Sequence, residues 1–333
     1  MIRLLLYFIL LFASLRVSAF PAGLLSNSED WFKSAEGMET TACILSWQSD
    51  HGSWPKNQDN ARNRYSGDRK KIKGTFDNGS TTDELRFLAC AYRATNDSRC
   101  EKAFLLGLDH ILEAQYPNGG WPQYFPLSQQ YHRHITFNDN TMVRLMDFLR
   151  EVVAGQMCPF VDDARRTRSR EAFDKGIDCI LKCQIIIDGK PTVWCAQHDE
   201  VTLKPAAARS YELASLSGSE SAGILRFLMS IEEPSPAVIK SVKAGEAWFE
   251  NHKITGIRIE KVNGDRQVIK DPGAPPVWAR FYDLETSRPY FCDRDGVKKD
   301  SIAEIGKERR NGYAWYGNWG ESVLNSYAKW PHR

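Results

Sequence analysis

Carboxylate and amide side chains stand in two similar short segments, each directly ahead of an apolar stretch. Asp77 and Asn78 belong to the first segment, TFDN, and Asp139 belongs to the second, TFND. Their oxygen atoms suit a hard cation such as calcium, which takes several oxygen ligands. The same residue types also cap the N-termini of helices. The residues alone therefore leave a calcium site and plain helix capping open, and no EF-hand pattern decides between them.

A long polar stretch at residues 194–221 holds many further side chains capable of chemistry. It contains His198, Arg209, Ser217 and Ser219. A serine hydrolase would use one of these serines with His198 and an acid, but the G-x-S-x-G pattern that presents such a serine is absent. His198 can instead hold the loop by a hydrogen bond. The stretch indicates a functional loop without specifying its reaction.

Arginines are frequent in the last quarter of the chain. Arg280 lies in the string WARFY and Arg294 in FCDRD. A guanidinium group binds a carboxylate through two parallel hydrogen bonds. Nearby aromatic side chains suit the faces of sugars, although core packing is the commoner role of any one ring. Spacing alone does not select among these arginines.

A repeated motif shows which elements would position these side chains. The string ILxxQ, followed by Gly and Trp, ends in Gln48, Gln115 and Gln184, with separations of 67 and 69 residues. Each interval fits two helices with their loops. Asp77 and Asp139 lie in polar turns that open apolar helices between the motifs. We therefore predict a mainly α fold, an α/α toroid of about three helical-hairpin repeats, whose polar turns face each other at one rim.

The segment from about residue 255 to 333 has a different character. It begins with alternating apolar residues at 257–259, contains the break PGAPP at 272–276, and continues as irregular aromatic-rich sequence. We expect extensive coil with a few short strands lying over the toroid. Because no linker separates this segment from the helices, we expect one domain over residues 20–333.

Residues 1–19 read as a secretory signal peptide, with Arg3, an apolar run and the small-residue site VSA. We expect a secreted or periplasmic protein and, after cleavage, no membrane attachment. Cleavage removes Arg3, Arg16 and no acid, which brings the formal charge from +2 to zero. A balanced charge gives no field for nucleic acid, so an anionic substrate needs a local cluster of basic side chains. We expect a monomer.

Eight cysteines occur in the chain, an even number in an exported protein. They allow up to four disulfides, but their spacing does not fix a pairing and buried thiols are the alternative. Zinc binding is weakly indicated, because no C-x-x-C pair is present.

Seven strings together resemble the pectate lyases of polysaccharide lyase family ten, in an order that covers nearly the whole mature chain. They are TFDNGSTTDELRFL, NGGWPQYFPL, YHRHITFNDNTM, WCAQHD, ARSYELASLSGSES, VWARFYDLET and RNGYAWYG. The resemblance implies a helical toroid of three repeats with much coil. It also implies cleavage of α-1,4-linked polygalacturonate by calcium-assisted anti β-elimination, which leaves a 4,5-unsaturated sugar.

The resemblance also assigns roles to individual residues. It implies that Asp77, Asn78 and Asp139 form the surroundings of Ca²⁺ and the substrate carboxylate, with Asp77 able to serve either. Arg209 would be the base, and Arg280 and Arg294 would hold uronate carboxylates. We also expect a substrate contact from His198, within WCAQHD.

A base of this kind must be neutral, which is costly for a guanidinium group. We expect nearby cations to lower the pKa of Arg209 and an alkaline pH optimum to follow. Two alternatives come from other classes. A non-catalytic pectin-binding module would keep the aromatic and arginine contacts, whereas a toroidal terpene cyclase or prenyltransferase would need an apolar central cavity.

Overall fold

The computed structural model of the protein describes residues 20–333, so the predicted signal peptide lies outside the described residues. Helices dominate the structure, as predicted. They are α1 (Glu29–Lys33), α2 (Ala35–Ser46), α3 (Thr82–Thr95), α4 (Ser98–Glu113), α5 (Thr141–Ala154), α6 (Asp163–Cys183), α7 (Glu220–Met229), α8 (Pro236–Asn251), α9 (Lys307–Gly312) and α10 (Trp319–Lys329). Short 3-10 helices are η1 (Ala22–Ser26), η2 (Arg69–Lys71), η3 (Asp77–Gly79), η4 (Tyr131–Arg133), η5 (Asn138–Asn140) and η6 (Ile302–Glu304).

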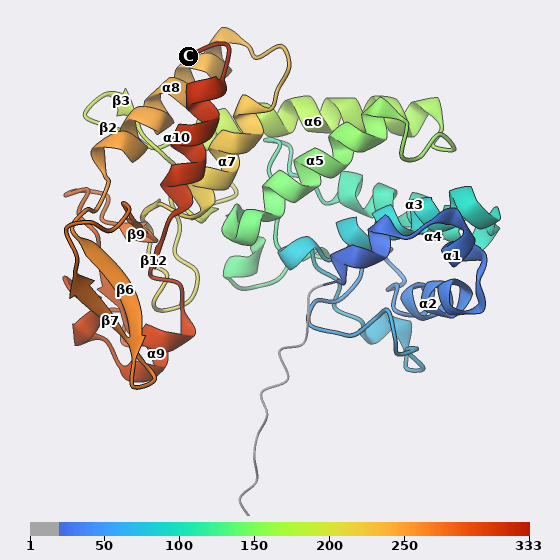
Figure 1. Cartoon of the computed structure of the whole chain (residues 1–333). Helices are drawn as coiled ribbons and strands as arrows, with labels where there is room; N and C mark the ends of the chain where they lie inside the picture. The colour runs from blue at the N-terminus through green and yellow to red at the C-terminus, as the bar shows by residue number, and fades with distance from the viewer. Residues whose placement is uncertain (1–19) are drawn as a thin grey trace, which may run out of the picture.

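Helices α3 to α8 form three consecutive hairpins that follow one another in an arc (Figure 1). The first helix of each hairpin, α3, α5 or α7, contacts the first helix of the next, while α2, α4, α6 and α8 form the outer row. Helices α1 and α2 lie at one end of the arc, and α8 with α10 lies at the other. The predicted mainly α toroid with three helical-hairpin repeats is confirmed.

The repeated glutamines explain why the hairpins stack in register. Each side-chain amide donates to a carbonyl of its own loop and to a carbonyl of the next outer helix, so it joins two repeats. The acceptors are Gly52 and Ala103 for Gln48 (3.1 and 2.8 Å), Gly119 and Ala172 for Gln115 (3.0 and 2.8 Å), and Thr192 and Ser241 for Gln184 (2.9 and 3.0 Å). Because these carbonyls are wholly or partly buried, the bonds satisfy groups that would otherwise lack partners.

The repeated tryptophans anchor each loop to the outer helix that precedes it. Trp54 Nε1 donates to the carbonyl of Ile44 (2.8 Å), and Trp121 and Trp194 make the same bond to Ile111 and Ile180 (2.9 and 2.7 Å). Trp278 repeats the bond at the end of α8, to Phe249 (2.9 Å). The loops that carry the polar rim are thus fixed to the helical framework at equivalent points.

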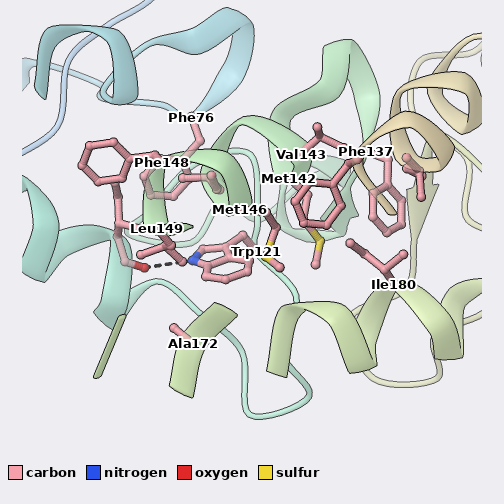
Figure 2. Packing of buried hydrophobic residues seen from close by; sticks show 14 of the residues in the cluster. Phe76, Trp121, Phe137, Met142, Val143, Met146, Phe148, Leu149, Ala172 and Ile180 are labelled. Atoms are coloured by element: carbon pink, nitrogen blue, oxygen red, sulfur yellow. Dashed lines mark hydrogen bonds between the residues drawn. The ribbon is translucent and has the colours of Figure 1, made fainter. Parts of the chain in front are cut away.

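The hydrophobic core lies between the two rows of helices. Figure 2 shows Trp121 packed beside Met146 and Leu149, with the bond from its indole nitrogen drawn as a dashed line. All three side chains are fully buried. Gly176 in α6 leaves room for these side chains, because a Cβ at this position would lie 2.3 Å from Met146 Sδ and 3.2 Å from the Trp121 ring. A side chain at Gly176 would therefore force Met146 to move.

The C-terminal segment contains short antiparallel strands, as predicted. The longest pair is β6 (Ile257–Val262) with β7 (Asp265–Lys270), where Ile257 pairs with Lys270. The two-residue strands are β1 (Ile135–Thr136), β2 (Ile186–Ile187), β3 (Lys190–Pro191), β4 (Gln197–His198), β5 (Leu216–Ser217), β8 (Trp278–Ala279), β9 (Phe281–Tyr282), β10 (Phe291–Cys292), β11 (Lys298–Lys299) and β12 (Tyr316–Gly317). Strand β8 pairs with β12, and β9 with β5. The β8–β12 pairing lies within the segment, and the β9–β5 pairing ties the segment to the loop ahead of α7.

Helix α10 is a correction to the expected coil, since it packs against α7 and α8. All eight cysteines, which lie within the described residues, are free thiols, so the disulfides considered above are not formed. Across residues 20–333, no helix is long and apolar enough to cross a membrane.

Candidate active site

The two polar turns predicted to face each other do so, because η3 and η5 are in contact. Asn78 and Asp139 both adopt left-handed backbone conformations, with φ of 55° and 52°. Asn and Asp tolerate this conformation better than other residues that carry a Cβ. Neither residue caps the following helix: α3 begins at a capping box formed by Thr81 and Glu84. Helix capping therefore does not account for the polar residues of the two turns.

Asp77 lies inside the rim and is almost fully buried. Its Oδ2 accepts a hydrogen bond from Lys56 Nζ in a close ion pair. Its Oδ1 is buried and has no hydrogen-bond partner among the described residues. A buried carboxylate oxygen without a donor is unfavourable unless a cation or ligand completes its coordination. Asp77 is thus able to accept a further positively charged group.

Asp139 is more open, with 41% of its side chain exposed. Asn138 Nδ2 donates to Oδ2 (2.8 Å), and Arg280 Nη2 lies 3.7 Å from Oδ1. Desolvation raises the pKa of Asp139, and the negative charges of Glu220 and Asp77 act in the same direction against the nearby Arg280. The two predicted carboxylates are therefore close enough to repel each other, a condition that a bound cation would relieve.

Arg280 is held in the wall of the rim. It is buried, forms an ion pair with Glu220, and places its guanidinium carbon 4.8 Å from the centre of the Tyr313 ring. Burial lowers the pKa of Arg280, but the charge of Glu220 and those of the other acidic groups around it together outweigh burial, and the net pKa is raised. Its Nε is buried and has no partner within residues 20–333. Arg280 is a fixed cation with a free donor.

Arg209 also lies near Tyr313, 5.9 Å from the ring centre, and 5.1 Å from the centre of the Tyr211 ring. Glu212 accepts from its Nε (2.6 Å) and also from the Tyr313 hydroxyl (2.6 Å). Burial lowers the pKa of Arg209, but the hydrogen bonds and charge of Glu212 prevail and raise it. The expectation that surrounding cations lower this pKa is therefore wrong for the described residues, because a carboxylate is the nearest charged group.

Two more arginines surround Tyr211. Arg294 lies 5.8 Å from the ring centre and is mostly exposed, where it pairs with Glu308 (3.1 Å). Arg309 is buried, 4.4 Å from the same ring, and its Nε has no partner in the described part of the chain. The structure thus brings Arg209, Arg280 and Arg294 together around two tyrosines, as a local basic cluster.

Sequence reasoning missed four members of this group. Glu212 stands three residues after Arg209, a spacing that suits an ion pair within one turn, and this signal was available. The others, Lys56, Arg309 and Tyr313, come from distant segments, and no spacing relates them to the rim.

His198 does not belong to the site, which corrects the expected substrate contact. Its side chain is fully buried. Its Nε2 accepts from the Cys195 backbone nitrogen (3.0 Å), and its Nδ1 donates to the Leu203 carbonyl (2.8 Å). Desolvation lowers its pKa to about 4, so the ring is neutral. His198 holds the loop, and neither of its nitrogens is free to bind a ligand or activate a serine.

A second group of possible metal ligands, His134, Asp199 and Glu200, lies on neighbouring loops. Its members already have partners: Glu200 accepts from Arg133 Nε (2.5 Å) and contacts His134 Nδ1 (2.9 Å). Asp199 Oδ1 accepts from the backbone nitrogens of Val201 and Thr202. These contacts indicate that the three side chains hold the neighbouring loops in place, and we call this group the loop clamp.

The rim offers a better fit to calcium. Asp77 and Asp139 supply carboxylate oxygens from two adjoining turns, one of those oxygens is buried without a partner, and the amide of Asn78 lies in the same turn as Asp77. Two carboxylates fall short of the six to eight oxygens that Ca²⁺ takes, so amide oxygens, water or a bound carboxylate would complete the coordination.

Comparison with known proteins bears on the whole chain. The sequence profile of a family described as pectic acid lyase matches residues 48–324. The structure is similar to a family 10 polysaccharide lyase from Cellvibrio cellulosa, with 37% identity, a TM-score of 0.83, and coverage of 94% of this chain and 97% of the other. It is also similar to a mutant of family 10 polysaccharide lyase from Cellvibrio cellulosa in complex with trigalaturonic acid (36% identity, TM-score 0.82, coverage of 93% and 97%). No curated protein sequence matches the chain.

Proposed function

The chain belongs to the pectic acid lyase family and is a polysaccharide lyase, and from this premise we propose that it cleaves α-1,4-linked polygalacturonate by calcium-assisted anti β-elimination. The product would be an oligogalacturonide with a 4,5-unsaturated end. The substrate assignment is supported by the Cellvibrio lyase whose complex contains trigalaturonic acid.

One structural observation carries the proposal for the site: Arg209 and Arg280 both lie over the Tyr313 ring, 5.9 and 4.8 Å from its centre, and Arg280 also contacts Asp139. A candidate base, a candidate carboxylate-binding cation and a candidate calcium ligand therefore form one continuous group. These groups come from three separate segments of the chain. Helix packing and surface solvation would not require them to converge.

Arg280 would bind the carboxylate of the sugar that loses its proton. The C5 proton is α to that carboxylate, so its removal builds negative charge on the carboxylate oxygens. A buried guanidinium group that is already fixed by Glu220 stabilises this charge without having to reorganise. Arg280 Nη2 is used by Glu220 and Nε is buried, so Nη1, which has no hydrogen-bond partner within residues 20–333, is the donor available for this contact.

Asp139 and Asp77, with the amide of Asn78, would hold Ca²⁺ beside the same carboxylate. When bound there, the ion would withdraw electrons from the carboxylate and acidify C5. Asp139 is the better placed ligand because its side chain is partly exposed, whereas Asp77 offers only the oxygen that Lys56 does not occupy. Lys56 neutralises part of the charge of Asp77 and so limits its affinity for a cation.

Arg209 would remove the C5 proton as a neutral base, and the bond to the C4 oxygen would then break. Glu212 orients the guanidinium group but also favours its protonated form. We therefore propose that Arg209 works at alkaline pH, and that Ca²⁺, when bound in the site, would lower the pKa of Arg209 before proton transfer. Arg294, exposed beside Tyr211, would bind a neighbouring uronate.

The test is the ultraviolet absorbance of the unsaturated product when the protein is mixed with polygalacturonate, with calcium or with a chelator. A calcium-dependent rise that Arg209→Ala abolishes, while binding to polygalacturonate persists, supports the proposal. Binding with no rise under any condition would favour the non-catalytic pectin-binding module.

A further inference from the structure

A groove of about 1000 Å³ lies beside the rim, on the side of Asp77. Its walls come from two segments, residues 47–74 and 124–132, which precede and follow the first helical hairpin. None of the arginines of the candidate active site lines it. The groove is thus a separate feature that adjoins the site.

The groove is strongly basic although the chain as a whole is nearly balanced in charge. Four lysines line it, Lys56, Lys70, Lys71 and Lys73, and none of the described residues that line it is acidic. The last three are exposed and, within residues 20–333, have no carboxylate within 4.0 Å. These lysines thus share one concave surface, and no described residue that lines it carries a carboxylate to neutralise them. This arrangement creates a local field for an anion.

Aromatic side chains line the groove together with the lysines. Trp47 and Tyr65 contact each other with ring centres 4.7 Å apart, and Tyr124 meets His132 edge to face at 5.1 Å. All four line the groove and are partly exposed. Rings of this kind bind the apolar faces of sugars while lysines bind carboxylates. The lining therefore suits a ligand that carries both features.

The groove is continuous with the candidate active site. Lys56 lines it and also pairs with Asp77 at the rim. His132 lines it too; burial lowers the pKa of this ring, and the charges of Lys56 and Arg209 act in the same direction. A chain leaving the rim past Asp77 would therefore meet Lys56 and the groove that it lines.

We propose that this lysine groove binds a distal stretch of the same polyuronate chain, several sugars away from the bond that is cleaved. The proposal rests on the proposed function and extends it. A polyuronate has one carboxylate on every sugar, so it matches a groove lined by both lysines and rings. The groove would make the enzyme favour long chains, because a trisaccharide occupying the rim would not reach Lys70, Lys71 and Lys73.

The experiment compares the wild type with a triple variant, Lys70→Gln, Lys71→Gln and Lys73→Gln. A matched control replaces three exposed lysines of outer helices, Lys102→Gln, Lys240→Gln and Lys243→Gln. The control makes the same change in net charge without touching the groove. Each protein is assayed for lyase activity on long polygalacturonate and on trigalacturonate. Binding of long polygalacturonate is measured separately by affinity electrophoresis, in an Arg209→Ala background.

We expect the groove variant to bind long polygalacturonate about tenfold more weakly than the control, since each exposed pair contributes little and three act together. We expect its kcat/KM to fall on the polymer and to stay unchanged on trigalacturonate. The difference from wild type should shrink at high salt, which screens exposed charges. Equal losses on both substrates, or equal losses in groove and control variants, would overturn the proposal. If wild type itself cleaves neither substrate, the proposed function fails instead.

Discussion

Arg209 and Glu212 form a two-point ion pair within a single turn, with 2.6 Å between Nε and Oε2 and 2.5 Å between Nη2 and Oε1. The pair fixes the plane of the guanidinium group, since two parallel bonds leave it no rotation. It also raises the pKa of Arg209. The same contact that positions the proposed base therefore disfavours its neutral form, and this opposition can be measured.

Replacing Glu212 with glutamine should lower the pKa of Arg209, because the carboxylate that stabilises its cation is gone. If Arg209 acts as a neutral base, the alkaline rise in kcat/KM should move to lower pH, even where the maximum rate falls through poorer positioning. The measurement is the pH profile of polygalacturonate cleavage. Glu308→Gln, which removes the exposed partner of Arg294, is the control. A rising limb that stays in place would show that Arg209 does not titrate in the reaction.

The calcium requirement for activity should change when a carboxylate of the rim is replaced, and should not change when a carboxylate of the loop clamp is replaced. We expect Asp139→Asn to raise the calcium concentration for half-maximal activity by at least about tenfold, because one charged ligand of few is lost. Glu200→Gln changes a carboxylate of the clamp formed with His134 and Asp199, and it should leave the calcium requirement unchanged. Calcium titrations of activity, with isothermal titration calorimetry in the presence of trigalacturonate, test both. The reverse pattern would place the ion at the clamp.

Replacement by lysine should affect the kinetics differently at Arg280 and at Arg294. Arg280 is buried and bound to Glu220, so Arg280→Lys would lose the second donor in a water-poor site and should reduce kcat by about 10²-fold. Arg294 is mostly exposed, and Arg294→Lys should mainly raise KM, by a few-fold. Steady-state kinetics on polygalacturonate separate the two effects. Equal losses in both variants would contradict the roles assigned to them.

The helical repeats could be predicted from the sequence because the recurring spacing of their residues reflects hydrogen bonds within each repeat. Gln48 and Trp54 satisfy backbone carbonyls at fixed positions in each hairpin, so the same letters recur wherever the same carbonyls need donors. The facing of Asp77 and Asp139 followed from that register. Helix α10 was not readable, since Gly320 near its start lowers helix propensity and is needed only because Trp278 packs against it.

The arginine cluster could not be predicted from residue spacing, because its contacts join residues that lie far apart in the chain. Arg280 lies within 3.5 Å of Asn138, which is 142 residues away in the chain, and Tyr313 donates to Glu212 across 101 residues. Such contacts depend on how the C-terminal coil lies over the toroid, and no local pattern encodes that path. His198 was misjudged because a histidine in a polar loop looks accessible, whereas its burial is a property of the packed loop.

Glu84 should make the stability of the fold depend on pH. It is fully buried, and desolvation raises its pKa from 4.5 to about 7, although Asn60 and the Thr81 backbone donate to it. Because the folded state holds this proton more tightly than the unfolded state, its contribution is fully present below pH 4.5 and is lost as the pH rises through about 7.

Urea unfolding across this range should therefore show a decline in stability toward higher pH that Glu84→Gln removes. The Asn60 amide can rotate to accept from the new glutamine amide, since its Oδ1 is buried without a partner in the described structure. Asp265→Asn serves as the comparison, because that carboxylate lies elsewhere and its pKa is lowered. A decline that persists unchanged in Glu84→Gln would assign it to other groups.

Gln48→Ala should destabilise the fold by about 2–3 kcal/mol, because the carbonyls of Gly52 and Ala103 lose their shared donor in a buried position. Gln184→Ala should cost a similar amount and Gln115→Ala less, since Gln115 is only half-buried. The exposed Gln156→Ala is the control and should change little. Urea unfolding gives each free energy. If Gln48→Ala matched Gln156→Ala, the repeated glutamines would not be what joins one hairpin to the next, and the recurring motif would need another physical cause.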